Sequence, residues 1–136
     1  MRIFAILLKH FKNKGIPVVA LFISGRPMWV NAELNASDAF VAVWLPGSEG
    51  GGVADVILAD INGDIQFDFK GKLSYSWPKM AEQTAVNRYD EDYAPLLPYG
   101  FGLTYGDNNI LTDTLSEAIY SAVDNKQTVD IFNGSV

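Results

Sequence analysis

The sequence predicts an α/β fold, in which a mostly parallel sheet is flanked by helices as a partial three-layer α/β sandwich, followed by an irregular, partly β meander. Two continuous apolar runs, residues 16–23 and 39–45, indicate strands buried on both faces. A short helical segment separates the runs, and a glycine-rich loop with a further helix follows the second run. This order of elements is typical of an α/β sheet.

An amphipathic helix is expected at the N-terminus. Ile3, Leu7 and Phe11 recur at helical spacing, and Gly15 ends the pattern. The first 14 residues carry four basic side chains and no acidic one, so a helix lying on a membrane surface is the alternative. The apolar run after Arg2 is too short for a secretory signal peptide, and basic residues follow it in place of a cleavage site.

The remaining elements follow from turn signals and periodicity. Asn31–Ala36 is expected to form a short helix, and a further helix should run from residue 48 or 49 to about residue 59. Alternation of apolar and polar residues in 65–69 and 73–77 predicts a hairpin or edge strands. An aromatic meander follows to residue 105.

Composition limits the class of protein. The 136 residues make one domain at most, and the net charge of −6 argues against sequence-independent nucleic-acid binding. The absence of cysteine excludes thiolate metal sites, and the single histidine, His10, excludes a multi-histidine cluster. No acidic residue near His10 in the sequence could orient it as a base, which favours a surface or interface role. We expect no cofactor, no metal and no membrane span.

Two loops imitate ligand-binding motifs. Residues 47–52 could hold an anion on backbone N–H groups, but they lack the Lys-Ser/Thr of a P-loop. Close approach of a helix to the sheet is the favoured reason for these glycines. Asp60, Asn62 and Asp64 match the first ligands of an EF-hand, yet Ile65 replaces its obligatory glycine, so a turn is favoured.

Other side chains suit carbohydrate chemistry. The acidic run 90–92 could supply paired carboxylates for glycoside hydrolysis, although a solvated loop is the simpler interpretation. Trp29, Trp44 and Trp77 are natural stacking platforms for sugars. Trp44 lies within an expected strand and is assigned to the core. Trp29 and Trp77 end loops, which leaves packing and binding open for both.

Four strings, taken in order, resemble the second domain of family 3 glycoside hydrolases, in particular bacterial β-glucosidases and β-glucan exohydrolases. They are LLKHFKNKGIPVVALFISGRPMWVN, ELNASDAFVAVWLPGSEGGGVADVIL, GKLSYSWP and YAPLLPYGFGLTY. The resemblance covers about residues 5–106. It assigns residues 1–105 to the C-terminal portion of the α/β sandwich domain, and 106–136 to a linker or the start of a further module.

The resemblance implies a retaining, exo-acting enzyme in which a barrel domain supplies an Asp nucleophile and the sandwich domain supplies a Glu acid/base. In such enzymes the two carboxyl groups stand about 5–5.5 Å apart. The family's acid/base Glu precedes the segment matching residues 15–27, so no catalytic residue is assigned here. Candidates for the substrate cleft are Arg26, Trp29, Glu49 and Trp77. For Arg26, structural pairing with a loop carbonyl is favoured.

The sequence therefore leaves three candidate functions. The first is a part of a β-glucosidase that acts on β-glucan or cello-oligosaccharide only in the intact enzyme, and is inactive alone. The second is a non-catalytic module that binds carbohydrate or a partner through Trp29, Trp77 and the tyrosine-rich loops. The third is an anion-binding domain. Relatives of the first kind are often periplasmic or secreted, but no signal fixes the compartment. Open apolar strand edges predict association with the missing barrel domain or with a second copy.

Overall fold

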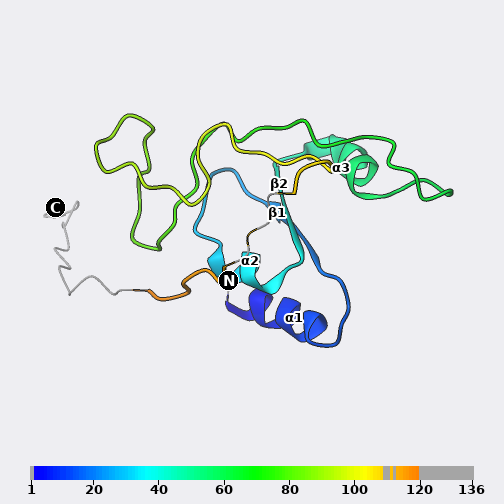
Figure 1. The fold of residues 1–136 in the computed structure, drawn as a ribbon, viewed down its shortest axis with the longest axis horizontal. Coiled ribbons are helices and arrows are strands. Elements are labelled where there is room, and N and C mark those ends of the chain that lie inside the picture. Colours follow the sequence, from blue (N-terminus) through cyan, green and yellow to red (C-terminus); the bar gives the residue numbers. More distant parts are fainter. Residues whose placement is uncertain (1, 109–110, 112, 120–136) are drawn as a thin grey trace, which may run out of the picture.

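A small parallel sheet lies at the centre of the molecule. Two helices lie near one end of its strands, and a third helix lies near the other end (Figure 1). The computed structural model describes residues 2–108, 111 and 113–119. The elements follow in the order α1 (Arg2–Lys12), β1 (Val19–Ile23), α2 (Asn31–Ala36), β2 (Ala39–Trp44), the 3-10 turn η1 (Gly47–Glu49) and α3 (Gly50–Ile57). The predicted α/β fold class is confirmed.

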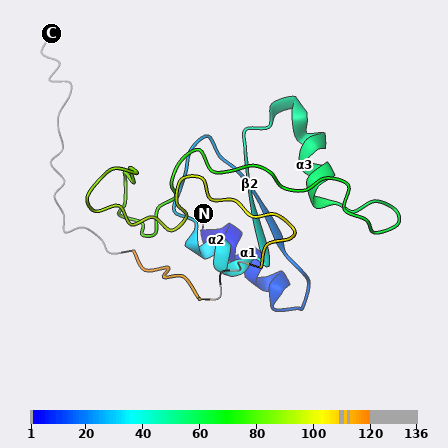
Figure 2. The ribbon, with the colours of Figure 1, turned by 45° about the horizontal axis from the view of Figure 1, so that its top comes forward.

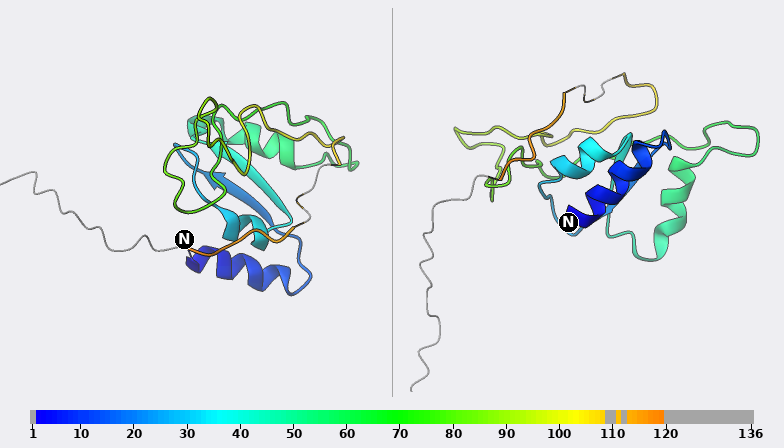
Figure 3. Two further views of the ribbon diagram at one scale, coloured as in Figure 1. Left: turned by 60° about the vertical axis from the view of Figure 1, so that its left-hand side comes forward. Right: turned by 90° about the horizontal axis from the view of Figure 1, so that it is seen from below.

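The main buried cluster lies where α1 and α2 meet the sheet (Figure 3). Its members are small or aliphatic side chains with one aromatic ring packed on them: Leu8, Val18, Ala20, Ala36 and Phe40. α1 turns Ala5 and Leu8 inward, and α2 contributes Ala36 beside its buried Asn31 and Glu33. The apolar face predicted for the first helix is wrong, because Ile3, Leu7 and Phe11 are exposed. The cluster is small, so the fold depends on few contacts.

The two strands pair in parallel, with Val19 opposite Ala39 at the start of the ladder. The prediction that both strands are buried on both faces is wrong for this structure. In β1, Ala20 is buried while Val19, Leu21 and Ile23 are exposed. The physical reason is that α1 and α2 cover one face of the sheet, and no described element covers the face of these three side chains.

A carboxylate fixes the entrance to both strands. Asp38, just before β2, accepts a hydrogen bond of 2.9 Å from the Val18 N–H. Its other oxygen lies 3.3 Å from the Lys12 ammonium of α1. The backbone bond from Val18 and then the bond from Lys12 lower the pKa of Asp38 below its ordinary value. One side chain therefore ties α1, β1 and β2 together.

Replacing this carboxylate should give a pH-dependent loss of stability. Because the folded pKa of Asp38 is depressed, its contribution is present above the unfolded value of about 3.9 and is lost as pH falls through the folded value. We expect Asp38→Asn to lower the Tm at about pH 7, with a difference from the wild type that shrinks as the pH falls below the unfolded pKa of about 3.9. Thermal unfolding across this range measures it. Asp55→Asn, on an exposed α3 carboxylate, is the control; a Tm difference for Asp38→Asn that is constant with pH would contradict the assignment.

Residues 113–119 lie against the α1–α2 pair. The Asn35 side chain of α2 accepts a bond from the Leu115 N–H and donates one to the Leu115 carbonyl, each 2.9 Å. Lys9 forms an ion pair of 2.8 Å with Glu117. Part of the segment that was assigned to a linker or further module therefore contacts the domain, and residues 120–136 lie outside the described residues.

The expected hairpin of residues 65–69 and 73–77 does not form. Neither segment is a strand, and residues 73–77 instead join residues 97–101 through backbone hydrogen bonds of 2.8–2.9 Å. The segment 65–69 lies beside α3, and the long loops reach away from it across the molecule (Figure 2). Alternation within a segment does not specify which distant segment pairs with it, so the sequence pattern assigned the wrong partner.

Candidate functional site

The loops that leave β1 and β2 meet at the same edge of the sheet. The Ser24 N–H donates to the Trp44 carbonyl over 3.1 Å, and a Cβ placed on Gly25 would lie 3.6 Å from the Leu45 side chain. Trp44 has a φ of 54°, in the left-handed region, where the chain turns out of β2. In open α/β sheets, the carboxyl ends of the strands are the usual place for a ligand crevice.

Two cleft candidates stand on these loops. Arg26 follows β1 and Glu49 ends η1, and both side chains are exposed. Glu49 accepts a hydrogen bond of 3.1 Å from the neighbouring Ser48 hydroxyl. Among the described residues, neither Arg26 nor Glu49 forms an ion pair. The charged groups of Arg26 and Glu49 therefore both lie at the edge of the sheet, where a partner could pair with them.

The two tryptophan candidates are less accessible. Trp77 is 1% exposed and packs edge-on against Phe22, Phe40 and Trp44, with ring centroids 5.8–6.0 Å apart. Trp29 is half-buried. The Nε1 atoms of Trp29 and Trp77 are buried and form no hydrogen bond with the described residues. The structure thus places Trp77 in the core beneath the sheet edge, while Arg26 and Glu49 lie on its surface.

The glycine-rich loop contacts little. Gly47 has a φ of 56°, a left-handed conformation that favours glycine. At Gly50, Gly51 and Gly52, by contrast, an added Cβ would meet no atom within 4 Å. Close approach of α3 to the sheet therefore does not explain these three glycines in the described structure.

The acidic candidates behave as loop residues. Asp60 accepts hydrogen bonds from the N–H groups of Asn62 and Asp64, at 2.8 and 2.9 Å, and these bonds lower its pKa. This is the geometry of a turn, as the favoured interpretation predicted. The run 90–92 borders a hollow of about 250 Å³ formed by residues 82–93. Within the described residues, no group of three acidic or histidine side chains is arranged to hold a metal ion.

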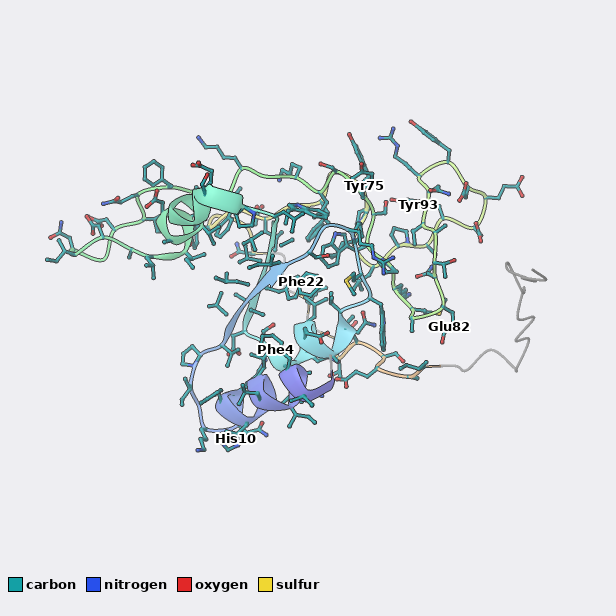
Figure 4. All side chains as sticks on the ribbon, turned by 180° about the vertical axis from the view of Figure 1, so that it is seen from behind. Phe4, His10, Phe22, Tyr75, Glu82 and Tyr93 are labelled. Carbon is teal, nitrogen blue, oxygen red and sulfur yellow. The ribbon has the colours of Figure 1, made fainter. Side chains whose placement is uncertain are left out.

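His10 lies on α1, at the opposite end of the molecule from the tyrosine-rich loops (Figure 4). Its ring packs edge-on against Phe11, with centroids 5.7 Å apart. In the part of the chain that the structure describes, no helix has the length and apolar character needed to cross a membrane.

The sequence named the tyrosine-rich loops only in general, and the structure adds a particular group of side chains on the ribbon formed by residues 73–77 and 97–101. Tyr75 and Tyr99 are exposed there, and the Arg88 guanidinium stacks on Tyr99. The available signal was the pair of aromatic strings SYSW and LPYGF, but their pairing across the 19 residues of loop between them was not visible in either string.

These features define a partial α/β sandwich whose strand ends carry open polar side chains. The family model described as "Glycosyl hydrolase family 3 C-terminal domain" matches residues 5–105, and the chain belongs to this family. The resemblance noted from the four strings is therefore confirmed.

Named relatives are glycosidases. The chain is 32% identical to a periplasmic β-glucosidase of Salmonella typhimurium over 81% of its own length and 16% of that protein. It is 35% identical to a xylan 1,4-β-xylosidase of Xylanibacter ruminicola over 72% of its length and 12% of that protein. The crystal structure of an exo-1,3/1,4-β-glucanase from a Pseudoalteromonas species is 61% identical with a TM-score of 0.81, covering 85% of this chain and 14% of that one. The chain thus spans a small part of each relative.

Proposed function

We propose that this chain acts as one part of a retaining, exo-acting β-glucosidase that releases glucose from β-glucan or cello-oligosaccharide. The observation that carries the proposal is the 61% identity to an exo-1,3/1,4-β-glucanase at a TM-score of 0.81. The family match over residues 5–105 supports it. In this proposal the Asp nucleophile and Glu acid/base come from polypeptide outside these 136 residues, and a barrel domain is the partner.

Within that enzyme, the loops after β1 and β2 would border the substrate cleft. Arg26 is always charged and presents several donors, which suits sugar hydroxyls or the orientation of a carboxylate. Glu49 is exposed on the neighbouring loop. Trp29 would contribute packing at the margin of the cleft, and the buried Trp77 would support the loops from below. The catalytic step itself would be double displacement through a covalent glycosyl-enzyme.

A chimera tests the proposal. Residues 5–105 of this chain would replace the matching segment of the Pseudoalteromonas exo-β-glucanase, and hydrolysis of an aryl β-glucoside would be measured. We expect the chimera to keep kcat/KM within about tenfold, or about 1.4 kcal/mol, of the parent, and the 136-residue chain alone to show no turnover.

Two results would overturn it. One is a chimera that folds and binds like its parent but does not hydrolyse the glucoside. The other is turnover by the isolated chain that disappears in Glu49→Gln, because that would place a catalytic carboxylate within residues 1–136. Glu91→Gln, in the exposed loop 90–92, is the matched control for the loss of one carboxylate.

A further inference from the structure

The loops that follow α3 carry three exposed tyrosines, and an arginine stacks on two of them. Tyr75, Tyr89 and Tyr99 are 66%, 85% and 51% exposed. The Arg88 guanidinium carbon lies 4.6 Å from the ring centroid of Tyr89 and 4.3 Å from that of Tyr99. These four residues are called the tyrosine surface below.

Backbone hydrogen bonds bring the segments that carry two of the tyrosines together. Residues 73–77 and 97–101 run antiparallel, and hydrogen bonds of 2.8 Å join the two segments at both ends. Leu73 is bonded to Gly100 and Phe101, and Trp77 is bonded to Leu96 and Leu97, so Tyr75 and Tyr99 both lie between these two sets of bonds. The two exposed rings therefore share one region of the surface.

Polar groups beneath the surface hold it in place. The Ser76 hydroxyl lies 2.8 Å from the Tyr93 hydroxyl, and the Tyr99 N–H donates to both, over 3.1 and 3.3 Å. Ser76 is buried, and Figure 4 shows Tyr75 and Tyr93 in the same loop region. A surface ordered before binding loses less conformational entropy when a ligand arrives.

We propose that the tyrosine surface binds a neutral β-linked glucan chain. The inference rests on the proposed function for its substrate class. Sugar rings present C–H groups that pack on exposed aromatic faces, and tyrosine supplies that area together with a hydroxyl. The Arg88 guanidinium donates to the Tyr89 hydroxyl and forms no ion pair with a described residue, so its remaining N–H donors can reach sugar hydroxyls.

Charge decides between a neutral and an anionic ligand. The acidic run 90–92 follows Arg88 and Tyr89 directly, and the whole chain carries a net charge of −6. One arginine beside three carboxylates gives a surface that repels a polyanion. A neutral polysaccharide is not subject to this repulsion, and stacking provides its affinity.

Affinity electrophoresis of the full chain in gels that contain mixed-linkage β-glucan tests the proposal. The glucan should retard the wild type, and the double variant Tyr75→Ala/Tyr99→Ala should bind about tenfold more weakly, because it removes two of the rings on which sugars stack. Phe67→Ala removes an exposed ring from the segment beside α3 and should leave retardation unchanged. Tyr99→Phe keeps the ring and should retain binding.

Folding and function are separated by further measurements. Far-UV circular dichroism shows whether each variant is folded. If the double variant unfolds, the single variant Tyr75→Ala replaces it in the binding test, because that ring is 66% exposed. In the chimera, the same variants should hydrolyse the small aryl β-glucoside at the parent rate, so failure of the enzyme proposal is distinguishable from failure of this one. Absence of retardation for the wild type, equal retardation of the folded variants, or stronger retardation by carboxymethyl cellulose would overturn the inference.

Discussion

Trp77→Ala is expected to remove most of the stability of the isolated chain. The side chain is 1% exposed and contacts Phe22 of β1, Phe40 of β2 and Trp44 at the exit of β2. Truncation of a buried tryptophan to alanine lowers the free energy of unfolding by about 3–5 kcal/mol, through lost transfer energy and the cavity that remains. Because single domains are stable by only about 5–15 kcal/mol, the loss is a large fraction of the total.

The buried indole nitrogen makes a second variant informative. The Trp77 Nε1 has no hydrogen-bond partner among the described residues, and an unpaired buried donor costs about 1–3 kcal/mol. Trp77→Phe removes that donor and keeps an aromatic ring, so it should be destabilising by much less than Trp77→Ala. Urea unfolding followed by circular dichroism measures both. Ile61→Ala, on a fully exposed side chain, is the control. A loss below about 1 kcal/mol for Trp77→Ala would contradict the packing role.

Local signals predicted the elements near the N-terminus well. The helix Asn31–Ala36 has the predicted bounds, and the strand predicted for 39–45 is observed as Ala39–Trp44. The first strand begins at Val19 rather than at 16, because Pro17 has no N–H to donate and Val18 is bonded to Asp38 and Ala39. Periodicity and β-branched residues are properties of a single segment, so one segment suffices to detect them.

Long-range pairing could not be predicted in the same way. The strings 73–77 and 97–101 lie 20 residues apart, and Pro98 weakens the strand signal in the second. The placement of Arg26 and Glu49 at one edge followed from the two strands that precede them. The sequence pointed to the tyrosine-rich loops in general, but which of their tyrosines lie together depends on the distant pairing and could not be read from one segment.

The isolated chain is expected to self-associate through β1, and Leu21→Lys is expected to convert it to a monomer. Among the residues that the structure describes, β1 pairs with β2 on one side only, so its other edge presents unpaired N–H and C=O groups. On the same strand Val19, Leu21 and Ile23 are exposed. An exposed apolar edge strand is a template for pairing with another chain, and a lysine placed on it opposes that pairing.

Light scattering after gel filtration measures this difference in mass. The wild type should have at least twice the mass of the monomer, and Leu21→Lys should have the mass of a monomer. Leu58→Lys adds the same charge to an exposed leucine after α3 and should leave the mass unchanged. A wild-type chain that stays monomeric at about 100 μM would contradict the expectation, since interfaces of this kind form at micromolar concentrations.

Leu21→Lys also distinguishes whether the rest of a larger glycosidase or a second copy of this chain packs on β1. If the rest of a larger glycosidase packs on β1, Leu21→Lys should also reduce the yield of folded chimera, because a lysine ammonium would then be buried against apolar side chains without a partner. If a second copy alone covers β1, the chimera should tolerate the lysine. We expect the first result, since the chain spans only 14% of the Pseudoalteromonas exo-β-glucanase and the exposed face of β1 is apolar along its whole length.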